Sequence, residues 1–172
     1  MKNKNLMYWL LAFLLLGAFL IYVGADNSVG IKEEKTTSIV SEGELSVLEN
    51  DFDFGEISMK GGTVSRKFEI INNGEESVRI EKIYTSCACT TAYIDDSSGK
   101  RMGKFGMPGH KGLRSDAGVE VGAGESVFVE AVYDPAFHGP SAVGFIQRSV
   151  YIETNSKLKP KLELKFQAMV SR

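Results

Sequence analysis

The chain begins with a long apolar segment and continues with short alternating ones. Residues 6–25 contain no charged side chain. At about 1.5 Å rise per residue, a helix of that length spans roughly 30 Å, the hydrocarbon thickness of a bilayer. Lysines precede the segment at positions 2 and 4, and Asp26 follows it. The positive-inside rule therefore predicts a cytoplasmic N-terminus and an extracytoplasmic domain downstream.

A cleaved signal peptide is the alternative interpretation of the same segment. Val23-Gly24-Ala25 has the small residues of a cleavage site. However, the apolar run is longer than the usual signal core of about 7–15 residues. We therefore favour a single-pass anchor over residues 1–25, which makes the membrane a partner of the chain. Cleavage would leave the domain secreted or periplasmic, so both interpretations place it outside the cytoplasm.

The pattern changes twice after the apolar segment. Residues 26–43 are rich in Ser, Thr, Lys and Glu without apolar periodicity, which predicts a flexible linker. From residue 44 onward, apolar and polar residues alternate with the period of half-buried strands. The candidate strands are 45–48, 52–57, 64–71, 78–84, 127–133, 148–154 and 162–170. About seven strands without a convincing soluble helix predict an immunoglobulin-like antiparallel β-sandwich over residues 44–172.

Residues 95–124 interrupt this pattern. They hold eight of the chain's 18 glycines, and the part from Ser97 to Ser115 has five basic residues and no acidic one. We expect a long loop here, of a length that is uncommon in compact domains: structureless loops longer than about 12–15 residues tend to be functional or disordered. Met102 and Phe105 predict that part of the loop packs back onto the domain. A solvated basic loop is favoured over a site for lipid phosphate or a cell-wall polymer.

Overall charge and motifs exclude several function classes. The net charge is −2, which argues against a nucleic-acid binder. Residues 99–104 lack the spacing of a phosphate-binding loop. Residues 139–144 miss the spacing of a hydrolase nucleophile elbow by one position. We therefore predict no enzymatic activity.

Several short motifs occur in an order that resembles a known family. They are Phe52-Asp53-Phe54-Gly55, Asn72-Asn73-Gly74, Thr85-Ser86-Cys87-Ala88-Cys89-Thr90, Tyr133-Asp134-Pro135 and Thr154-Asn155. Together they resemble the bacterial family catalogued as domain of unknown function 1573, over roughly residues 45–170. The resemblance implies an exported or membrane-tethered immunoglobulin-like sandwich and no activity. The chain departs from the family at Ala88, where glycine is usual, and in its long basic segment.

The two cysteines are the main candidate chemistry. Cys87 and Cys89 are the only cysteines, and His110 and His138 are the only histidines. On an extended strand the two sulfurs would point to the same face. Two thiolates and two imidazoles suit tetrahedral zinc. Replacing one histidine by the thioether of Met107, or of Met102, would favour Cu(I).

Two other interpretations of the cysteines remain open. Buried thiols or a disulfide would make the pair structural. A disulfide requires a local kink, because extended i, i+2 spacing puts the Cα atoms near the upper limit of about 6.8 Å. Thiol–disulfide exchange is the third interpretation. The leading hypothesis is a membrane-tethered binding or scaffolding module with an envelope protein or cell-wall component as partner, and copper or zinc at Cys87, Cys89, His110, His138 and Met107. The alternatives are a structural adhesion or assembly domain and a thiol-dependent redox protein.

Overall fold

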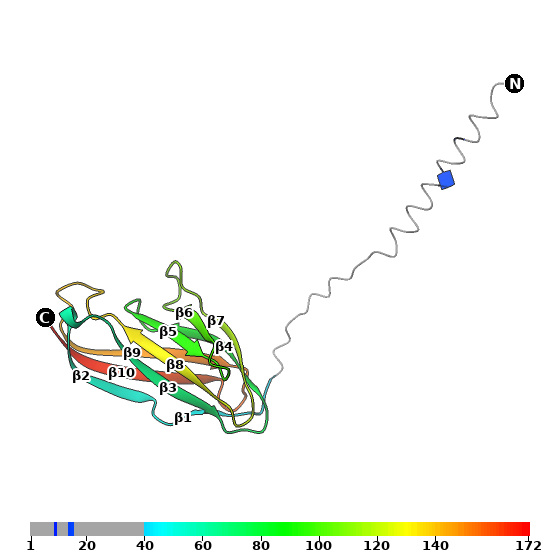
Figure 1. Cartoon of the computed structure of the whole chain (residues 1–172), viewed down its shortest axis with the longest axis horizontal. Coiled ribbons are helices and arrows are strands. Elements are labelled where there is room, and N and C mark those ends of the chain that lie inside the picture. Colours follow the sequence, from blue (N-terminus) through cyan, green and yellow to red (C-terminus); the bar gives the residue numbers. More distant parts are fainter. Residues whose placement is uncertain (1–8, 10–13, 16–39) are drawn as a thin grey trace. The chain divides into compact units, whose positions relative to one another are not determined.

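A computed structural model of the chain describes residues 9, 14–15 and 40–172 (Figure 1). The chain divides into two units, Met1–Thr37 and Ser38–Arg172. Within the described residues, no helix combines the length and apolarity needed to cross a bilayer. The predicted anchor at 1–25 and the predicted linker at 26–43 fall mostly outside these residues, so both stay predictions.

The second unit is an all-β sandwich of two five-stranded sheets, as the alternating pattern predicts. The first sheet has the order β1 (Leu45–Val47), β3 (Val64–Asn72), β8 (Ser126–Tyr133), β5 (Thr90–Asp95) and β6 (Arg101–Phe105). The second has the order β2 (Asp51–Ser58), β10 (Lys161–Ser171), β9 (Gly144–Thr154), β4 (Val78–Thr85) and β7 (Asp116–Val121). Neighbouring strands are antiparallel except for β2 and β10. A short 3-10 helix, Met59–Gly61, follows β2.

The core lies between the two sheets and follows the period of two. In β10 the side chains of Leu164, Phe166, Ala168 and Val170 are buried, and in β8 those of Val127, Val129, Ala131 and Tyr133 are buried. In a half-buried strand every second side chain points inward, so this pattern is expected. The alternation in the sequence therefore locates most of the core.

The segment 95–124 is not the long loop that its glycines predict. It contains β6 and β7, which are edge strands of the two different sheets. Phe105 at the end of β6 is completely buried. Leu113 packs so closely on Gly106 that a Cβ there would lie 2.1 Å from it. The glycines conceal two short strands because they permit close packing and supply few side chains that show a period.

Residues 40–172 therefore form ten strands where the sequence predicts about seven. The three additional strands, β5, β6 and β7, all follow the cysteines. In β5 the buried positions are Thr90, Ala92 and Ile94. Two of these three side chains are small or polar, so the strand shows little hydrophobic contrast in the sequence.

Candidate functional site

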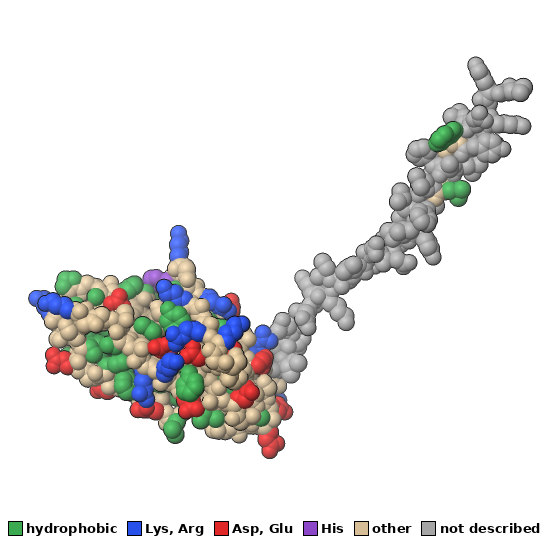
Figure 2. Space-filling model, in the orientation of Figure 1, with side chains coloured by type: hydrophobic (Ala, Val, Ile, Leu, Met, Phe, Trp, Pro, Cys, Tyr) green, Lys and Arg blue, Asp and Glu red, His purple; other side chains and the backbone are tan. Residues whose placement is uncertain are grey.

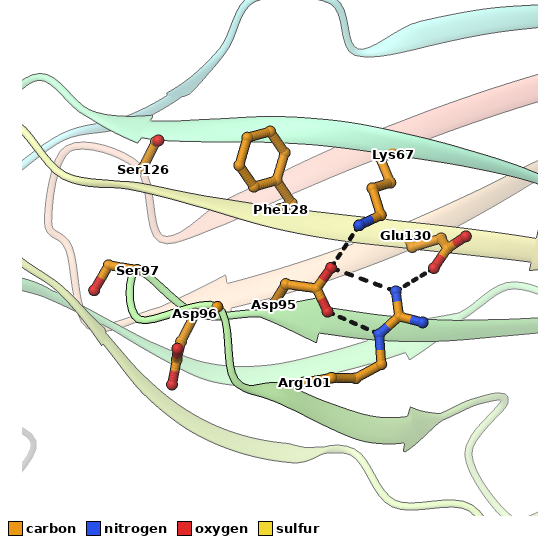
Figure 3. A pocket seen from close by; sticks show the side chains of 9 residues that line it. Lys67, Asp95, Asp96, Ser97, Arg101, Ser126, Phe128 and Glu130 are labelled. Atoms are coloured by element: carbon orange, nitrogen blue, oxygen red, sulfur yellow. Dashed lines mark hydrogen bonds and ion pairs between the residues drawn. The ribbon is translucent and has the colours of Figure 1, made fainter.

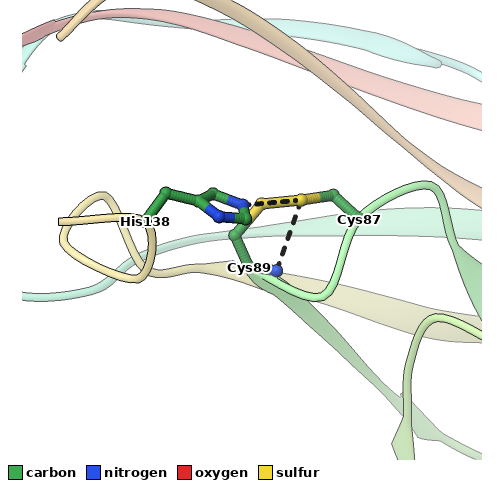
Figure 4. Close-up of side chains that lie close together, drawn as sticks. All are labelled: Cys87, Cys89 and His138. Carbon is green, nitrogen blue, oxygen red and sulfur yellow. Dashed lines mark hydrogen bonds between the residues drawn. A yellow bond between two sulfur atoms is a disulfide. The ribbon is translucent and has the colours of Figure 1, made fainter. Parts of the chain in front are cut away.

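The two cysteines lie in a tight turn between β4 and β5 and form a disulfide (Figure 4). The backbone N–H of Thr90 donates to the carbonyl of Cys87 at 3.1 Å, which closes the turn. The Cα atoms of the two cysteines are 5.3 Å apart, within the range of ordinary disulfides. The expectation that both cysteines occupy an extended strand is wrong, because the chain turns at this point.

Hydrogen bonds from three strands fix the disulfide turn. Thr85, the last residue of β4, places its hydroxyl 2.9 Å from the carbonyl oxygen of Cys87. Ser86 and Ser149 of β9 exchange two bonds: the Ser86 N–H donates to the Ser149 carbonyl, and the Ser149 N–H donates to the Ser86 hydroxyl. The N–H of Asp134, just after β8, donates to the carbonyl of Cys89 at 2.9 Å. The geometry of the two sulfurs is thus set by the sandwich itself.

The two sulfurs differ in their exposure. Cys89 is only 3% exposed and belongs to the hydrophobic core. Cys87 is partly buried and packs against the edge of that core. A molecule approaching from solvent therefore meets Cys87 first.

His138 reaches the disulfide from the connection between β8 and β9. Its Nε2 lies 3.3 Å from the Sγ of Cys87 (Figure 4). Asp134 starts the connection by accepting the N–H of Ala136 on its carboxylate at 2.9 Å. The N–H of Gly139 donates to the carbonyl of Ala136, and Gly139 has a φ of +79°, which only glycine adopts freely. This turn chemistry presents the imidazole to the exposed sulfur.

Arg148 in β9 contacts the other sulfur, and the sequence interpretation missed it. Its Nε donates to the Sγ of Cys89 at 3.3 Å. The inward series of β9 runs through Ile146, Arg148, Val150 and Ile152, so Arg148 is a charged residue at a core-facing position. A charge at such a position requires a partner. That signal was available in the sequence.

The phenol of Tyr133 also lies within the electrostatic influence of Arg148. Burial raises the pKa of Tyr133, although the positive charge of Arg148 opposes that shift. The phenol is therefore neutral near pH 7, and Arg148 is the charged side chain that touches the disulfide.

The remaining predicted ligands lie elsewhere. Ligand atoms of Cys87, Cys89 and His138 all fall within 4.8 Å of one another, and His110 is not part of this group. His110 is exposed in the connection between β6 and β7, where its N–H donates to the carbonyl of Met107. Met107 is 37% exposed in the same connection, and Met102 is part of β6. The structure therefore assembles three of the five proposed ligands.

A second polar cluster occupies the outer face of the first sheet (Figure 3). Asp95 accepts from Arg101 at 2.7 Å and from Lys67 at 2.8 Å, and Arg101 also binds Glu130. The hydrogen bond from Arg101, followed by that from Lys67, lowers the pKa of Asp95. Each charge has an opposite partner, so the cluster joins β3, β5, β6 and β8 without an unpaired group aimed at a ligand.

Comparison with known proteins confirms the resemblance drawn from the motifs. Residues 45–104 match the model of a family described as Protein of unknown function (DUF1573). This part of the chain is similar to that family. The DUF1573 match includes the disulfide turn and ends within β6, so His138 and Arg148 lie beyond it. No curated protein matches the chain.

Solved structures share the fold. A protein of unknown function from Porphyromonas gingivalis W83 superposes with a TM-score of 0.56 at 19% identity, covering 76% of this chain and 48% of that one. This chain thus spans about half the length of that structure. A PapD-like domain of human CEP192 matches with a TM-score of 0.43 at 13% identity, over 74% of this chain and 85% of that domain. At these identities the likeness concerns the sandwich fold and carries no activity.

Proposed function

We propose that this DUF1573 domain is a thiol–disulfide exchange module in which Cys87 and Cys89 form a reversible disulfide. One observation carries the proposal: each sulfur has its own basic partner, His138 at Cys87 and Arg148 at Cys89. A disulfide that only cross-links the fold needs neither partner. Exchange needs both, because it creates a thiolate first on one sulfur and then on the other.

The first step uses the difference in exposure. A thiolate of a partner dithiol attacks the Sγ of Cys87, the more accessible sulfur, and forms a mixed disulfide with it. The Cys87–Cys89 bond breaks, and its electron pair goes to the Sγ of Cys89. The Nε–H of Arg148 already lies 3.3 Å from that sulfur and stabilises the new thiolate by a charge-assisted hydrogen bond.

The second step releases the partner. Its other thiolate attacks the partner sulfur of the mixed disulfide, and the electron pair of that bond goes to the Sγ of Cys87. His138, whose Nε2 lies 3.3 Å away, is placed to give the departing sulfur a proton. The partner has become a disulfide, and the two cysteines have gained two electrons. Cys87 carries the proton from His138, Cys89 stays a thiolate beside Arg148, and a proton released by the partner thiols restores His138. The reverse direction reduces a partner disulfide and re-forms the Cys87–Cys89 bond, and the difference in potential decides which direction prevails.

Location supports the exchange proposal. The apolar segment at 6–25 predicts delivery outside the cytoplasm, where disulfides form and persist. The scaffolding role favoured by the sequence is compatible with exchange, since a tethered domain can hold its partner while the sulfurs react. The charged residue in contact with Cys89 is the reason to prefer exchange over a purely structural pair.

Metal binding by the reduced pair is the second candidate. Cys87, Cys89 and His138 hold their ligand atoms within 4.8 Å, a spacing that suits zinc or Cu(I). The guanidinium of Arg148 weighs against it, because a fixed positive charge beside one sulfur repels a cation. His110 is not among the ligand atoms that lie together there, so it supplies no fourth ligand in this arrangement.

Reduction of the native protein tests the exchange proposal. The full chain is incubated in dithiothreitol buffers of graded potential, and thiols are counted by alkylation and mass spectrometry while circular dichroism reports the fold. We expect two thiols to appear and disappear reversibly with the sandwich intact. His138→Ala should slow exchange, and the matched variant His110→Ala should not.

Two outcomes would contradict the proposal. If the disulfide opens only as the domain unfolds, the cysteines are structural. If the reduced protein instead retains one equivalent of zinc or copper, measured by elemental analysis, and His138→Ala releases it, metal binding is the better assignment.

A further inference from the structure

The end of the sandwich that carries the disulfide is free of charged residues over two long stretches. Residues 83–94 on one side and residues 135–147 on the other contain no Asp, Glu, Lys or Arg, although 24% of the chain is charged. Hydrogen bonds hold the two stretches together at the disulfide, from Asp134, the charged residue just before the second stretch, to Cys89, and between His138 and Cys87. We call these two stretches the charge-free end.

The charge-free end exposes large apolar side chains. Phe137 is 50% exposed, and Val143 and Phe145 are also exposed. The Phe137 ring meets the His138 ring edge to face, with centroids 5.0 Å apart. Since His138 touches Cys87, an exposed aromatic ring lies one side chain away from the accessible sulfur. Apolar groups left in water beside a reactive site indicate an interaction surface.

The rest of the domain has a different surface. The face in Figure 2 mixes basic, acidic and apolar side chains. Phe128, an exposed phenylalanine on the first sheet, lines the hollow that also contains Lys67, Asp95 and Arg101 (Figure 3). Its surroundings are charged, whereas those of Phe137 are not. Phe128 is therefore the matched control for Phe137.

We propose that the charge-free end binds a neutral, extended segment of another protein in which a cysteine is flanked by apolar side chains. The inference rests on the proposed exchange function and names its partner. An apolar residue beside the partner cysteine would pack on Phe137 while the partner sulfur meets Cys87. The two stretches contribute no charged side chain, and their charged neighbours Asp134 and Arg148 are already engaged within the disulfide site. A peptide with charged flanks therefore gains little compensation for losing water there, which favours the neutral segment.

The test compares thiols that differ only in their flanks. Rates of disulfide reduction in the full chain are measured with a Leu-Cys-Leu peptide, with the same peptide carrying Asp or Lys flanks, and with glutathione. The readout is the ratio of each peptide rate to the glutathione rate. A variant that changes the rate only by disturbing His138 changes both rates equally and leaves this ratio unchanged. We expect the neutral peptide to lead by about two- to ten-fold, the range of one aromatic contact.

Variants assign that advantage to one ring. Phe137→Ser should remove the preference, Phe137→Leu should retain most of it, and Phe128→Ser should leave it as in the unaltered chain. An unchanged ratio in Phe137→Ser, or an equal loss in Phe128→Ser, would overturn the proposal.

A second measurement separates the surface from the chemistry. A peptide with serine in place of cysteine is titrated into the oxidised protein and followed by NMR. Binding that Phe137→Ser weakens supports the surface even if no exchange occurs, in which case only the proposed function fails. A dimer of this chain that depends on Phe137, seen by sedimentation, or Phe137-dependent binding to lipid vesicles would assign the surface to another occupant and overturn the proposal.

Discussion

Two regions of the domain each hold one of its two histidines, and they differ in almost every other respect. The charge-free end places His138 3.3 Å from Cys87. Its disulfide turn is hydrogen-bonded to Thr85 of β4, to Ser149 of β9 and to Asp134, just after β8. The connection between β6 and β7, residues 106–115, is basic, and its tip around His110 is exposed (Figure 1). A site therefore forms where the ends of several strands converge, and residue type alone does not locate it.

The β6–β7 segment has a structural role that its composition conceals. Its two strands lie at the edges of the two sheets, and Arg114, two residues before β7, donates from its backbone N–H to the carbonyl of Lys104 in β6. The Arg114 guanidinium lies over the Phe105 ring, 5.5 Å from its centroid. The segment therefore links the two layers at one side of the sandwich, with its polar tip in solvent.

The largest effect should come from breaking this link. Phe105→Ala removes a completely buried ring, and we expect the free energy of unfolding to fall by about 3–5 kcal/mol. Lys111→Ala at the exposed tip should change it by less than about 0.5 kcal/mol. Urea denaturation measures both. Equal, small effects would show that the segment is a loose insertion after all.

The next largest effect is expected at Arg148, which contacts Cys89. Arg148→Gln removes the charge at Cys89, and we expect native-state exchange to slow by about ten-fold, because a charged donor contributes about 1.5 kcal/mol or more to a buried anion. Arg148→Lys should recover part of the rate. The control is Arg79→Gln, which removes an exposed arginine 3.7 Å from Glu120, and it should leave the rate unchanged. Equal slowing in both variants would remove the specific role of Arg148.

A smaller effect concerns pH and the paired cluster on the first sheet. The folded pKa of Asp95 is lowered, so its ion pairs stabilise the fold above the unfolded pKa of about 4 and lose that effect as pH falls through the folded pKa. Arg101→Gln should cost less than about 1 kcal/mol at pH 7, since Arg101 is half exposed. That cost should shrink toward zero near pH 2. Thermal unfolding across pH measures it, and a cost independent of pH would contradict the assignment.

The smallest effect is expected at Ala88, the residue between the two cysteines. Among the described residues no non-glycine has a positive φ, so the disulfide turn does not require glycine here. Ala88→Gly should therefore lower stability by about 0.4–1 kcal/mol through the entropy of the unfolded chain. Stabilisation by this change would reveal strain at Ala88.

Sequence pattern predicts the sandwich well and the site only in part. The alternation in 162–170 and 127–133 locates β10 and β8, because the side chains buried at every second position of these strands are apolar. The same alternation does not reveal β6 and β7. Their edge positions and glycines leave too few apolar residues to show a period.

The site depends on contacts between residues far apart in the chain. Cys87 and His138 are separated by 51 positions, and Cys89 and Arg148 by 59. Sequence spacing cannot show which of the two histidines, His138 or His110, contacts the disulfide. That depends on which connection between strands passes close to the disulfide turn after β4. Arg148 was open to prediction, because a charged residue in the inward series of a strand needs a partner.

The most direct measurement identifies the sulfur that an incoming thiol attacks. The oxidised native protein is treated briefly with excess glutathione, quenched with acid, and mapped by peptide mass spectrometry. We expect a mixed disulfide on Cys87, with Cys89 left as a free thiol. Adducts on Cys89, or equal labelling of both cysteines, would contradict the assignment of Cys87 as the accessible sulfur and Cys89 as the leaving thiolate held by Arg148.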